Sequence, residues 1–259
     1  MNANKTILLI VFLILGIGLG CRKDLLKADS GKQFVVEVLP RAATDGDIVE
    51  RAIKITEIKL SAIRLDGKVT RDPDSPNRML VKIYGSDDLE KAKKFLFASY
   101  QLELKEVISP ASPAPLRVFS SRAEAEKAAA DDQEILAFND RGEDSFVIVK
   151  EAPIVTGGDI RDAQAVPNTG AADYHIAFNL NEDGAQKFGD WTGKNIGAYL
   201  GVVLDKKAIS APFIKSQIFD AGQIDGRFTK ETADDIAVSL KSGYLPATMK
   251  IVKEGPLEN

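Results

Sequence analysis

Along this chain the spacing of apolar residues switches between the period of a strand and that of a helix. Residues 34–39 form a β-rich run, residues 79–84 alternate as a second strand, and residues 102–107 alternate as a third. An apolar stripe over about residues 47–65 predicts a long helix, and a second helix is expected over about residues 86–98. The N-terminal part therefore predicts strands that alternate with helices.

A sheet built from these elements needs one more strand to cover an exposed edge. Residues 248–254, near the C-terminus, have an extended pattern and can supply that strand. We therefore predict an α+β fold with a ferredoxin-like base, residues 33–108 and 248–254, built from both ends of the chain. The intervening residues 116–247 are then expected to form an inserted α+β head subdomain.

Prolines gather where the chain is expected to pass between base and head. Residues 109–115 read SPASPAP, and their prolines stiffen the backbone and prevent regular pairing. We interpret this stretch as the first crossing and residues 243–248 as the second. The predicted hinge residues are Pro110, Pro113, Pro115, Gly243 and Pro246.

The predicted head contains a hairpin and several helices. Extended runs over residues 200–204 and 208–214 flank a polar turn at residues 205–207, which is a hairpin signature. Apolar residues after Thr229 recur at helical spacing until Gly243 stops the pattern. Further helices are expected over residues 122–133 and 160–165, and short strands over residues 134–138, 146–150 and 176–180.

The charge and the counts of reactive residues argue against enzymes and nucleic-acid-binding proteins. The net charge is −4, whereas a nucleic-acid footprint needs a basic face. With one cysteine, Cys21, and one histidine, His175, the chain has no disulfide framework and no cysteine or histidine metal cage. Ser210 lies outside any nucleophile elbow, and the TGGD stretch ending at Asp159 lacks the lysine of a phosphate loop. We therefore expect no enzymatic activity, cofactor, metal or nucleic-acid partner.

Residues 1–21 have the pattern of a targeting segment. Lys5 precedes an uncharged apolar run over residues 6–20, whose helix would rise about 22 Å, short of a hydrocarbon core of about 30 Å. This length suits a signal peptide, and Gly20 before Cys21 resembles a lipoprotein cleavage site at which the cysteine becomes lipidated. An uncleaved, slightly short membrane anchor is the alternative. Both place the rest of the chain outside the cytoplasm and attached to a membrane.

Four blocks in the C-terminal half contain distinctive sequence motifs. Residues 153–165 read PIVTGGDIRDAQA and residues 176–188 read IAFNLNEDGAQKF. Residues 192–214 read TGKNIGAYLGVVLDKKAISAPFI, and residues 224–247 read IDGRFTKETADDIAVSLKSGYLPA. In this order and spacing they resemble the first periplasmic domain of SecD, the accessory subunit of the bacterial protein translocase. The similarity is thinner over residues 34–107.

The resemblance implies a base and a head on the periplasmic side of the cell envelope. The implied partners are unfolded secretory polypeptides or Sec translocase subunits. SecD carries membrane helices after this domain, whereas this chain ends at Asn259, so we expect no proton-driven movement from it alone. Asp205-Lys206 stands where the family usually has Asp-Gly, so a primed turn would cost about 1 kcal/mol for the lysine. A longer loop through Lys207 is the alternative.

Apolar residues around an irregular polar loop of the head are the remaining candidates for function. They form either part of the core or a cleft for an extended polypeptide, bound by edge pairing or in a groove. The leading hypothesis is a non-enzymatic envelope protein that binds exported polypeptides or docks on the Sec translocon, with its head rotating on the base. The alternative is a structural or adaptor lipoprotein that binds other envelope proteins. The candidate polypeptide-binding residues are Trp191, Tyr199, Phe213, Ile214, Ile218 and Phe219.

Overall fold

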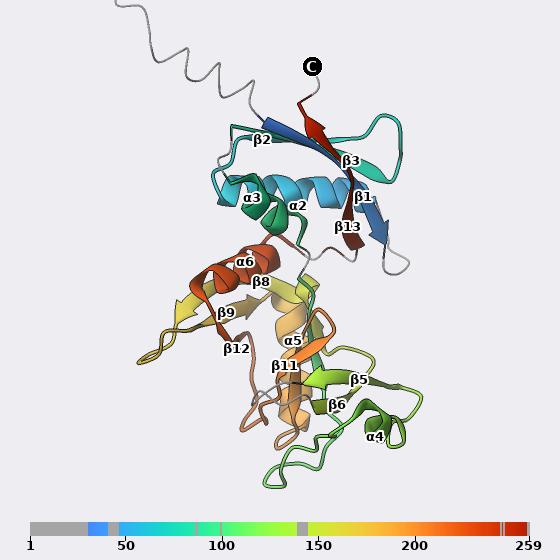
Figure 1. Ribbon diagram of the computed structural model, residues 1–259. Coiled ribbons are helices and arrows are strands. Elements are labelled where there is room, and N and C mark those ends of the chain that lie inside the picture. Colours follow the sequence, from blue (N-terminus) through green and yellow to red (C-terminus); the bar gives the residue numbers. More distant parts are fainter. Residues whose placement is uncertain are drawn as a thin grey trace, which may run out of the picture.

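The computed structural model describes residues 31–40, 47–85, 88–98, 100–138, 145–243, 245 and 247–257. The predicted targeting segment with Cys21, and the predicted hinge residue Pro246, lie outside the described residues. Figure 1 shows two lobes, with the first strand and the last strand of the fold side by side in the upper one. These two lobes correspond to the predicted base and head.

The base is a four-stranded antiparallel sheet with the order β13-β1-β3-β2. Together with its two helices, the chain order is strand, helix, strand, strand, helix, strand, which is the ferredoxin-like arrangement. Because β1 pairs along its length with β13, the two ends of the chain close one sheet, as predicted. The strands are β1 (Gly31–Pro40), β2 (Gly67–Arg71), β3 (Arg78–Tyr84) and β13 (Ala247–Pro256).

Helices α2 (Ile48–Ala62) and α3 (Leu89–Phe97) cover the side of the base sheet that faces the head (Figure 1). Helix α2 begins after Asp47, whose carboxylate accepts hydrogen bonds from two backbone N–H groups of the first turn. Helix α3 begins after Asp88, whose carboxylate accepts one hydrogen bond, from the Lys91 N–H. The apolar faces of both helices pack with the sheet in one core that includes Phe34, Val36, Ala52, Met79, Val81 and Leu96.

Two predictions about the base are wrong. Residues 102–107 do not join its sheet, because β4 (Leu102–Glu106) pairs with a head strand. The fourth base strand is β2, whose sequence GKVTR buries only Val69 and so lacks a readable alternation. The proline-rich residues 109–115 also lie within the head and not at a crossing. There the Ser112 N–H donates to the Gly197 carbonyl at 2.8 Å, and the Tyr199 hydroxyl donates to the Ala114 carbonyl at 2.7 Å.

The first sheet of the head has six strands in the order β6-β5-β11-β10-β4-β7. The predicted hairpin is present, since β10 and β11 pair antiparallel. Asp205 and Lys206 have φ angles of +50° and +64°, so the chain turns through the tight primed geometry and not through a longer loop. The further strands are β5 (Gln133–Phe138), β6 (Ser145–Lys150), β7 (Val155–Thr156), β10 (Leu200–Leu204) and β11 (Lys207–Ser210).

The second sheet of the head has three strands in the order β12-β9-β8. The helix predicted over residues 160–165 is wrong, because β8 (Ile160–Pro167) is a strand paired with β9 (Tyr174–Leu180). Asp159 and Thr156 instead close a short 3₁₀ turn, η1 (Gly157–Asp159), directly before β8. Strand β12 (Ala221–Phe228) was not predicted. The helices of the head are α4 (Arg122–Glu126), shorter than predicted, α5 (Glu182–Lys194) and α6 (Lys230–Lys241).

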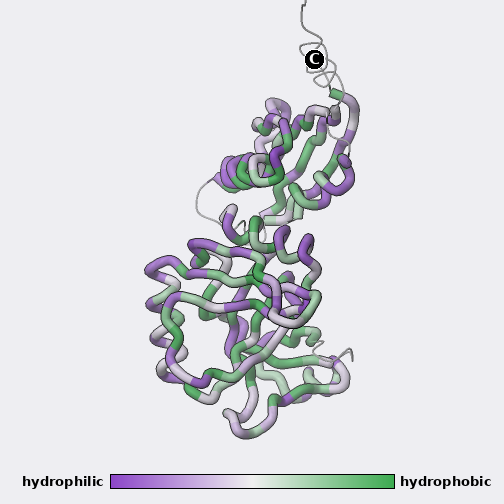
Figure 2. Tube along the Cα trace, turned by 90° about the vertical axis from the view of Figure 1, so that its left-hand side faces the viewer, coloured by the Kyte–Doolittle hydropathy of each residue, from purple (hydrophilic) through white to green (hydrophobic). Residues whose placement is uncertain are grey.

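The two head sheets face each other across a shared apolar core. Leu104 and Val202 contribute from the first sheet, Ile176 and Phe178 from the second, and Ile236 from α6. Figure 2 shows from the side that base and head are stacked end to end. Helix α6 lies next to the base helices at this junction (Figure 1), and its Glu231 forms an ion pair with Lys91 of α3.

Candidate functional site: an apolar groove in the head

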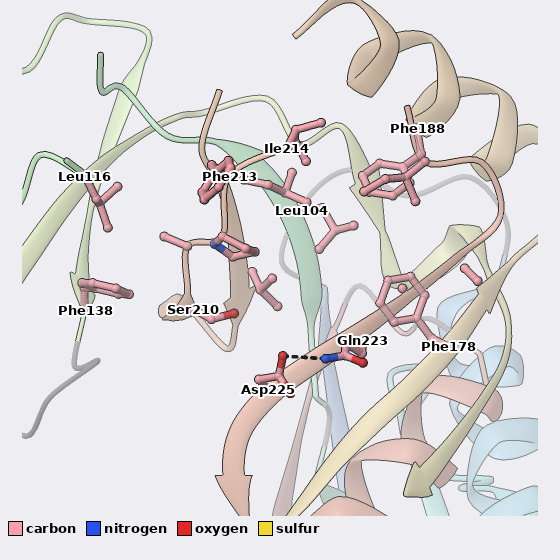
Figure 3. Close-up of a pocket in the computed structure, with 17 residues that line it drawn as sticks. Leu104, Leu116, Phe138, Phe178, Phe188, Ser210, Phe213, Ile214, Gln223 and Asp225 are labelled. Carbon is pink, nitrogen blue, oxygen red and sulfur yellow. Dashed lines mark hydrogen bonds between the residues drawn. The ribbon is translucent and has the colours of Figure 1, made fainter. Parts of the chain in front are cut away.

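A cavity of about 530 Å³ opens in the head beside strands β11 and β12. Its lining takes side chains from both head sheets, such as Leu104 from the first and Phe178 from the second (Figure 3). We call this cavity the head groove. Its apolar lining includes Leu104, Phe178, Phe188, Val202, Phe213 and Ile214.

The position of the Phe178 ring depends on a glycine across the strand pair. Gly222 on β12 is the register partner of Phe178 on β9. A Cβ atom on Gly222 would lie 2.5 Å from Cζ of Phe178, closer than any normal contact. The ring therefore lies over the position where any other residue would carry a side chain. This arrangement places an aromatic ring in the groove.

One wall of the groove, residues 211–220, is held against α5. Thr192 is fully buried, and its hydroxyl accepts a hydrogen bond from the Ile218 N–H at 2.9 Å. The Gln217 side chain donates to the Gly189 carbonyl at 3.0 Å. On the same wall, the Phe213 ring packs edge-on against the ring of Tyr199, with their centroids 6.2 Å apart. These contacts fix the wall without a ligand.

Charge is confined to one end of the groove. Asp225 is the one charged side chain in the lining that the structure describes, and its carboxylate accepts a hydrogen bond from Gln223 at 3.0 Å. Ser210 is the nearby hydroxyl, and His175 does not line the cavity. Among the described residues, no group of three or more His, Cys, Asp or Glu could hold a metal ion. The groove thus offers apolar contact area and no arrangement of catalytic groups.

The six candidate binding residues divide into two sets. Phe213, Ile214 and Ile218 line the groove. Tyr199 is buried behind Phe213, and the partly buried Trp191 packs on the core, so neither forms the cavity surface. Phe219 is 62% exposed but lies outside the lining.

Sequence reasoning missed the opposite side of the groove. Phe178 and Phe188 line the groove but are not among the candidate binding residues, and Leu104 was expected in the base. In residues 221–228, two glycines and three charged or amide side chains obscure the alternation of a strand. The remaining sign of a strand is the apolar Ile224 between polar residues, and the structure shows it fully buried between exposed neighbours.

Comparisons with known proteins identify the head and then most of the chain. Residues 133–247 match the family model described as SecDF, P1 head subdomain. The protein translocase subunit SecD of Aquifex aeolicus is 38% identical over 209 residues, which are 80% of this chain and 39% of that protein. Most of this chain is a homologue of the periplasmic P1 domain of SecD. SecD of Rhodobacter capsulatus is 30% identical over 226 residues, or 85% of this chain and 38% of that protein.

Solved SecDF structures agree with the base and head arrangement. The crystal structure of SecDF in a super-membrane-facing form superposes with a TM-score of 0.67 at 25% identity, covering 88% of this chain and 30% of that one. A second structure, titled as a membrane component SecDF that enhances protein export, has a TM-score of 0.64 at 23% identity. It is covered over 98% of its length by 85% of this chain, which shows that the fold is the P1 fold.

The extent of the match limits what the homology shows. The chain spans 39% and 38% of the SecD proteins from Aquifex aeolicus and Rhodobacter capsulatus. Both of these relatives are named as protein translocase subunits. In the part of the chain that the structure describes, no helix is both long enough and apolar enough to cross a bilayer.

Proposed function

We propose that this protein assists Sec-dependent export by binding extended segments of exported polypeptides in the head groove. The observation that carries the proposal is a preformed apolar groove, open to solvent, in a SecD-type head. The relatives are named as protein translocase subunits, and one related structure is described as enhancing protein export. Both descriptions support a role of this domain in export.

The chemistry of the groove favours an unfolded chain over a folded one. An unfolded polypeptide exposes apolar side chains that a folded protein buries, and each buried leucine or phenylalanine contributes about 1.5–3 kcal/mol. Because the polar side chains of the lining are limited to Ser210, Gln223 and Asp225, the groove selects for apolar character more than for a particular sequence. Binding of this kind is weak and reversible, so the exported polypeptide can leave the groove again during translocation.

The proposal also places the protein on the periplasmic side of the envelope, attached by its N-terminus. The support is the P1 homology together with the apolar run before Cys21. Lipidation of Cys21 and an uncleaved anchor predict different masses for the mature protein. Intact-mass measurement of protein extracted from membranes distinguishes the two. An unprocessed and unmodified N-terminus would contradict the lipidated form.

A mechanical role requires the head to move on the base. The chain crosses between them twice, once between α3 and β4 and once between α6 and β13. Gly243 has a φ of +105°, a conformation that side chains rarely adopt, and it lies at the second crossing. We place the hinge at these two crossings instead of at the proline-rich stretch. Head movement on this hinge would hold a bound chain against backward sliding.

Photocrosslinking in cells tests the proposed binding site. A photoreactive phenylalanine analogue replaces Phe213, which lines the groove, or Phe219, which is the more exposed of the two but lies outside it. We expect crosslinks to newly exported polypeptides from position 213 and few from position 219. Crosslinks only to resident envelope proteins would instead favour an adaptor, and equal yields from the two positions would contradict groove binding.

A further inference from the structure

Strand β12 forms one lip of the head groove and leaves one of its own edges unpaired. It is the outermost strand in the order β12-β9-β8, and it pairs with β9 from Ala221 opposite Asn179 to Ile224 opposite Ile176. In an edge strand, alternate N–H and C=O groups point away from the neighbouring strand. The same strand contributes Ala221, Gly222, Gln223 and Asp225 to the groove lining. A row of backbone donors and acceptors thus borders an apolar cavity.

The free edge carries little of the usual protection against pairing. Edge strands are commonly blocked by proline, lysine or a bulge. Residues 221–224 contain neither proline nor lysine, and their register with β9 is regular. The irregularity begins only after Ile224, and Arg227 within it has a φ of +50°. The stretch of this edge with a regular register is therefore short and is ended by the bulge.

The charges around the groove indicate which charge pattern a complementary partner needs. Asp225 lies at the bulge end, and at the Phe213 side Lys215 places its ammonium 5.5 Å from the centre of the Phe213 ring. The lining between them is uncharged, so a charged side chain there would lose its hydration without gaining a counter-ion. A complementary partner is apolar in its middle and tolerates a basic residue only next to Asp225.

We propose that the head groove binds an extended apolar polypeptide segment by adding it as a strand to the free edge of β12. Alternate side chains of the added strand enter the cavity, and its backbone pairs with residues 221–224. This inference rests on the proposed function and specifies its binding mode. Only a polypeptide backbone supplies the row of donors and acceptors that the edge lacks, so other apolar ligands would use the cavity alone.

Alternate N-methylation of a peptide tests this binding mode. The probe is a short synthetic peptide with leucine at every second position and uncharged polar residues between, titrated against the full chain. Successive N–H groups of a strand point to opposite edges, so methylating one alternate set blocks pairing with β12 and methylating the other set does not. We expect one methylated peptide to bind about tenfold or more weakly than the other.

Three results would overturn the inference in distinguishable ways. If both methylated peptides bind as well as the parent, only side chains are recognised, and groove binding survives without strand addition. If both are equally weakened, the effect has no edge specificity, and strand addition again fails. If neither the parent peptide nor an unfolded exported polypeptide binds, the proposed function fails as well.

Hydrogen exchange provides a second readout that needs no variant. Amides on the free edge of β12 exchange readily while no strand pairs with them, and an added strand protects them. We expect the parent peptide to slow exchange in residues 221–224 of the full chain. Protection confined to the 211–220 wall, with β12 unchanged, would contradict strand addition.

Discussion

Gly222 determines the depth of the groove, because the Phe178 ring covers its Cα. The Gly222→Ala variant must push the ring aside, and the displaced ring moves into the cavity. We expect a loss of roughly 1–3 kcal/mol in the free energy of unfolding and about tenfold weaker peptide binding. Urea denaturation and peptide titration measure the two effects. The matched control is Gly255→Ala on β13, where a Cβ meets nothing within 4 Å, and unchanged binding by Gly222→Ala would contradict this role.

Lys59 on α2 carries a buried charge next to the base–head junction. It is 1% exposed, and its ammonium donates to the backbone carbonyls of Phe95, at 3.3 Å, and Ala98 at the end of α3. Burial lowers the pKa of Lys59 from 10.5 to about 8, although the nearby carboxylate of Asp235 on α6 opposes that shift. Burial also raises the pKa of Asp235. Keeping Lys59 charged in the folded protein therefore lowers the free energy of unfolding.

The lowered pKa predicts a specific pH dependence of stability. Below about pH 8 both the folded and the unfolded chain hold the Lys59 proton, so the cost is constant. Between about pH 8 and pH 10.5, Lys59 is protonated to a larger fraction in the unfolded chain than in the folded chain, so the free energy of unfolding rises with pH. The wild type should gain up to about 3 kcal/mol over this range relative to Lys59→Met.

Urea denaturation at both ends of this pH range measures the gain. Lys54→Met, which removes an exposed lysine from the same helix, is the control and should track the wild type. Parallel pH curves for the wild type and Lys59→Met would contradict the account.

At the scale of elements, the β10–β11 hairpin is held by a charge network that reaches two other strands. Lys105 on β4 is 1% exposed and lies 2.7 Å from the carboxylate of Glu134 on β5 and 3.3 Å from that of Glu103. Lys206, in the strained turn, also contacts Glu134 at 3.1 Å. This contact helps to offset the cost of a lysine at positive φ, so the alternative of a longer loop through Lys207 is not needed.

Removing the charge of Glu134 should destabilise the head. Glu134→Gln leaves Lys105 with Glu103 as its remaining carboxylate, so we expect a loss of roughly 2 kcal/mol, less than for a fully unpaired buried charge. Burial opposes the charge of Glu134, but hydrogen bonds from Lys105 and Lys206 outweigh it and lower the pKa of Glu134 below 4.5. The stabilisation is therefore present above pH 4.5 and is lost as the pH falls through the lowered pKa.

Urea denaturation near neutral and acidic pH checks both statements. Glu126→Gln, at the exposed ion pair with Arg122, is the control with little expected effect. An equal change in the two variants would show that the network does not stabilise the sheet.

The elements that could be read from the sequence are those whose period is unbroken. The α2 stripe and the apolar face of α6 each follow one spacing over their whole length, and the β10–β11 hairpin is marked by two apolar runs around a polar turn. The pairing partner of β4 could not be read, since its alternation of Leu102 and Leu104 fits any half-buried sheet equally well. Strand β12 was hidden for the opposite reason, because Gly222 and Gly226 replace side chains that would have marked its faces. Its contributions to the groove lining, Ala221, Gly222, Gln223 and Asp225, were missed with it.

For the whole molecule, two crossings and the contact of α6 with the base connect the lobes. The Lys91–Glu231 ion pair joins α3 to α6, but both side chains are mostly exposed, so the pair contributes little stability. Val238 of α6 also packs against the base core, so opening the junction would cost mainly this apolar contact and little from the ion pair.

Joining base and head covalently tests the moving-head proposal. Cysteines at positions 91 and 231 are linked by a short bis-maleimide, with each single cysteine variant as control. We expect slower export of a reporter from cells carrying the linked protein, while peptide binding in the groove is unchanged because the groove lies away from the junction. Export at the unlinked rate would show that head movement is not required.

Binding of unfolded polypeptide by the full chain tests the central claim most directly. The measurement is a titration against one secretory polypeptide, unfolded and folded, with the wild type, Phe213→Ala in the groove and Phe219→Ala outside it. The account predicts saturable binding of the unfolded form only, about tenfold weaker in Phe213→Ala and unchanged in Phe219→Ala. Equal binding of both forms, or no effect of Phe213→Ala, would contradict it.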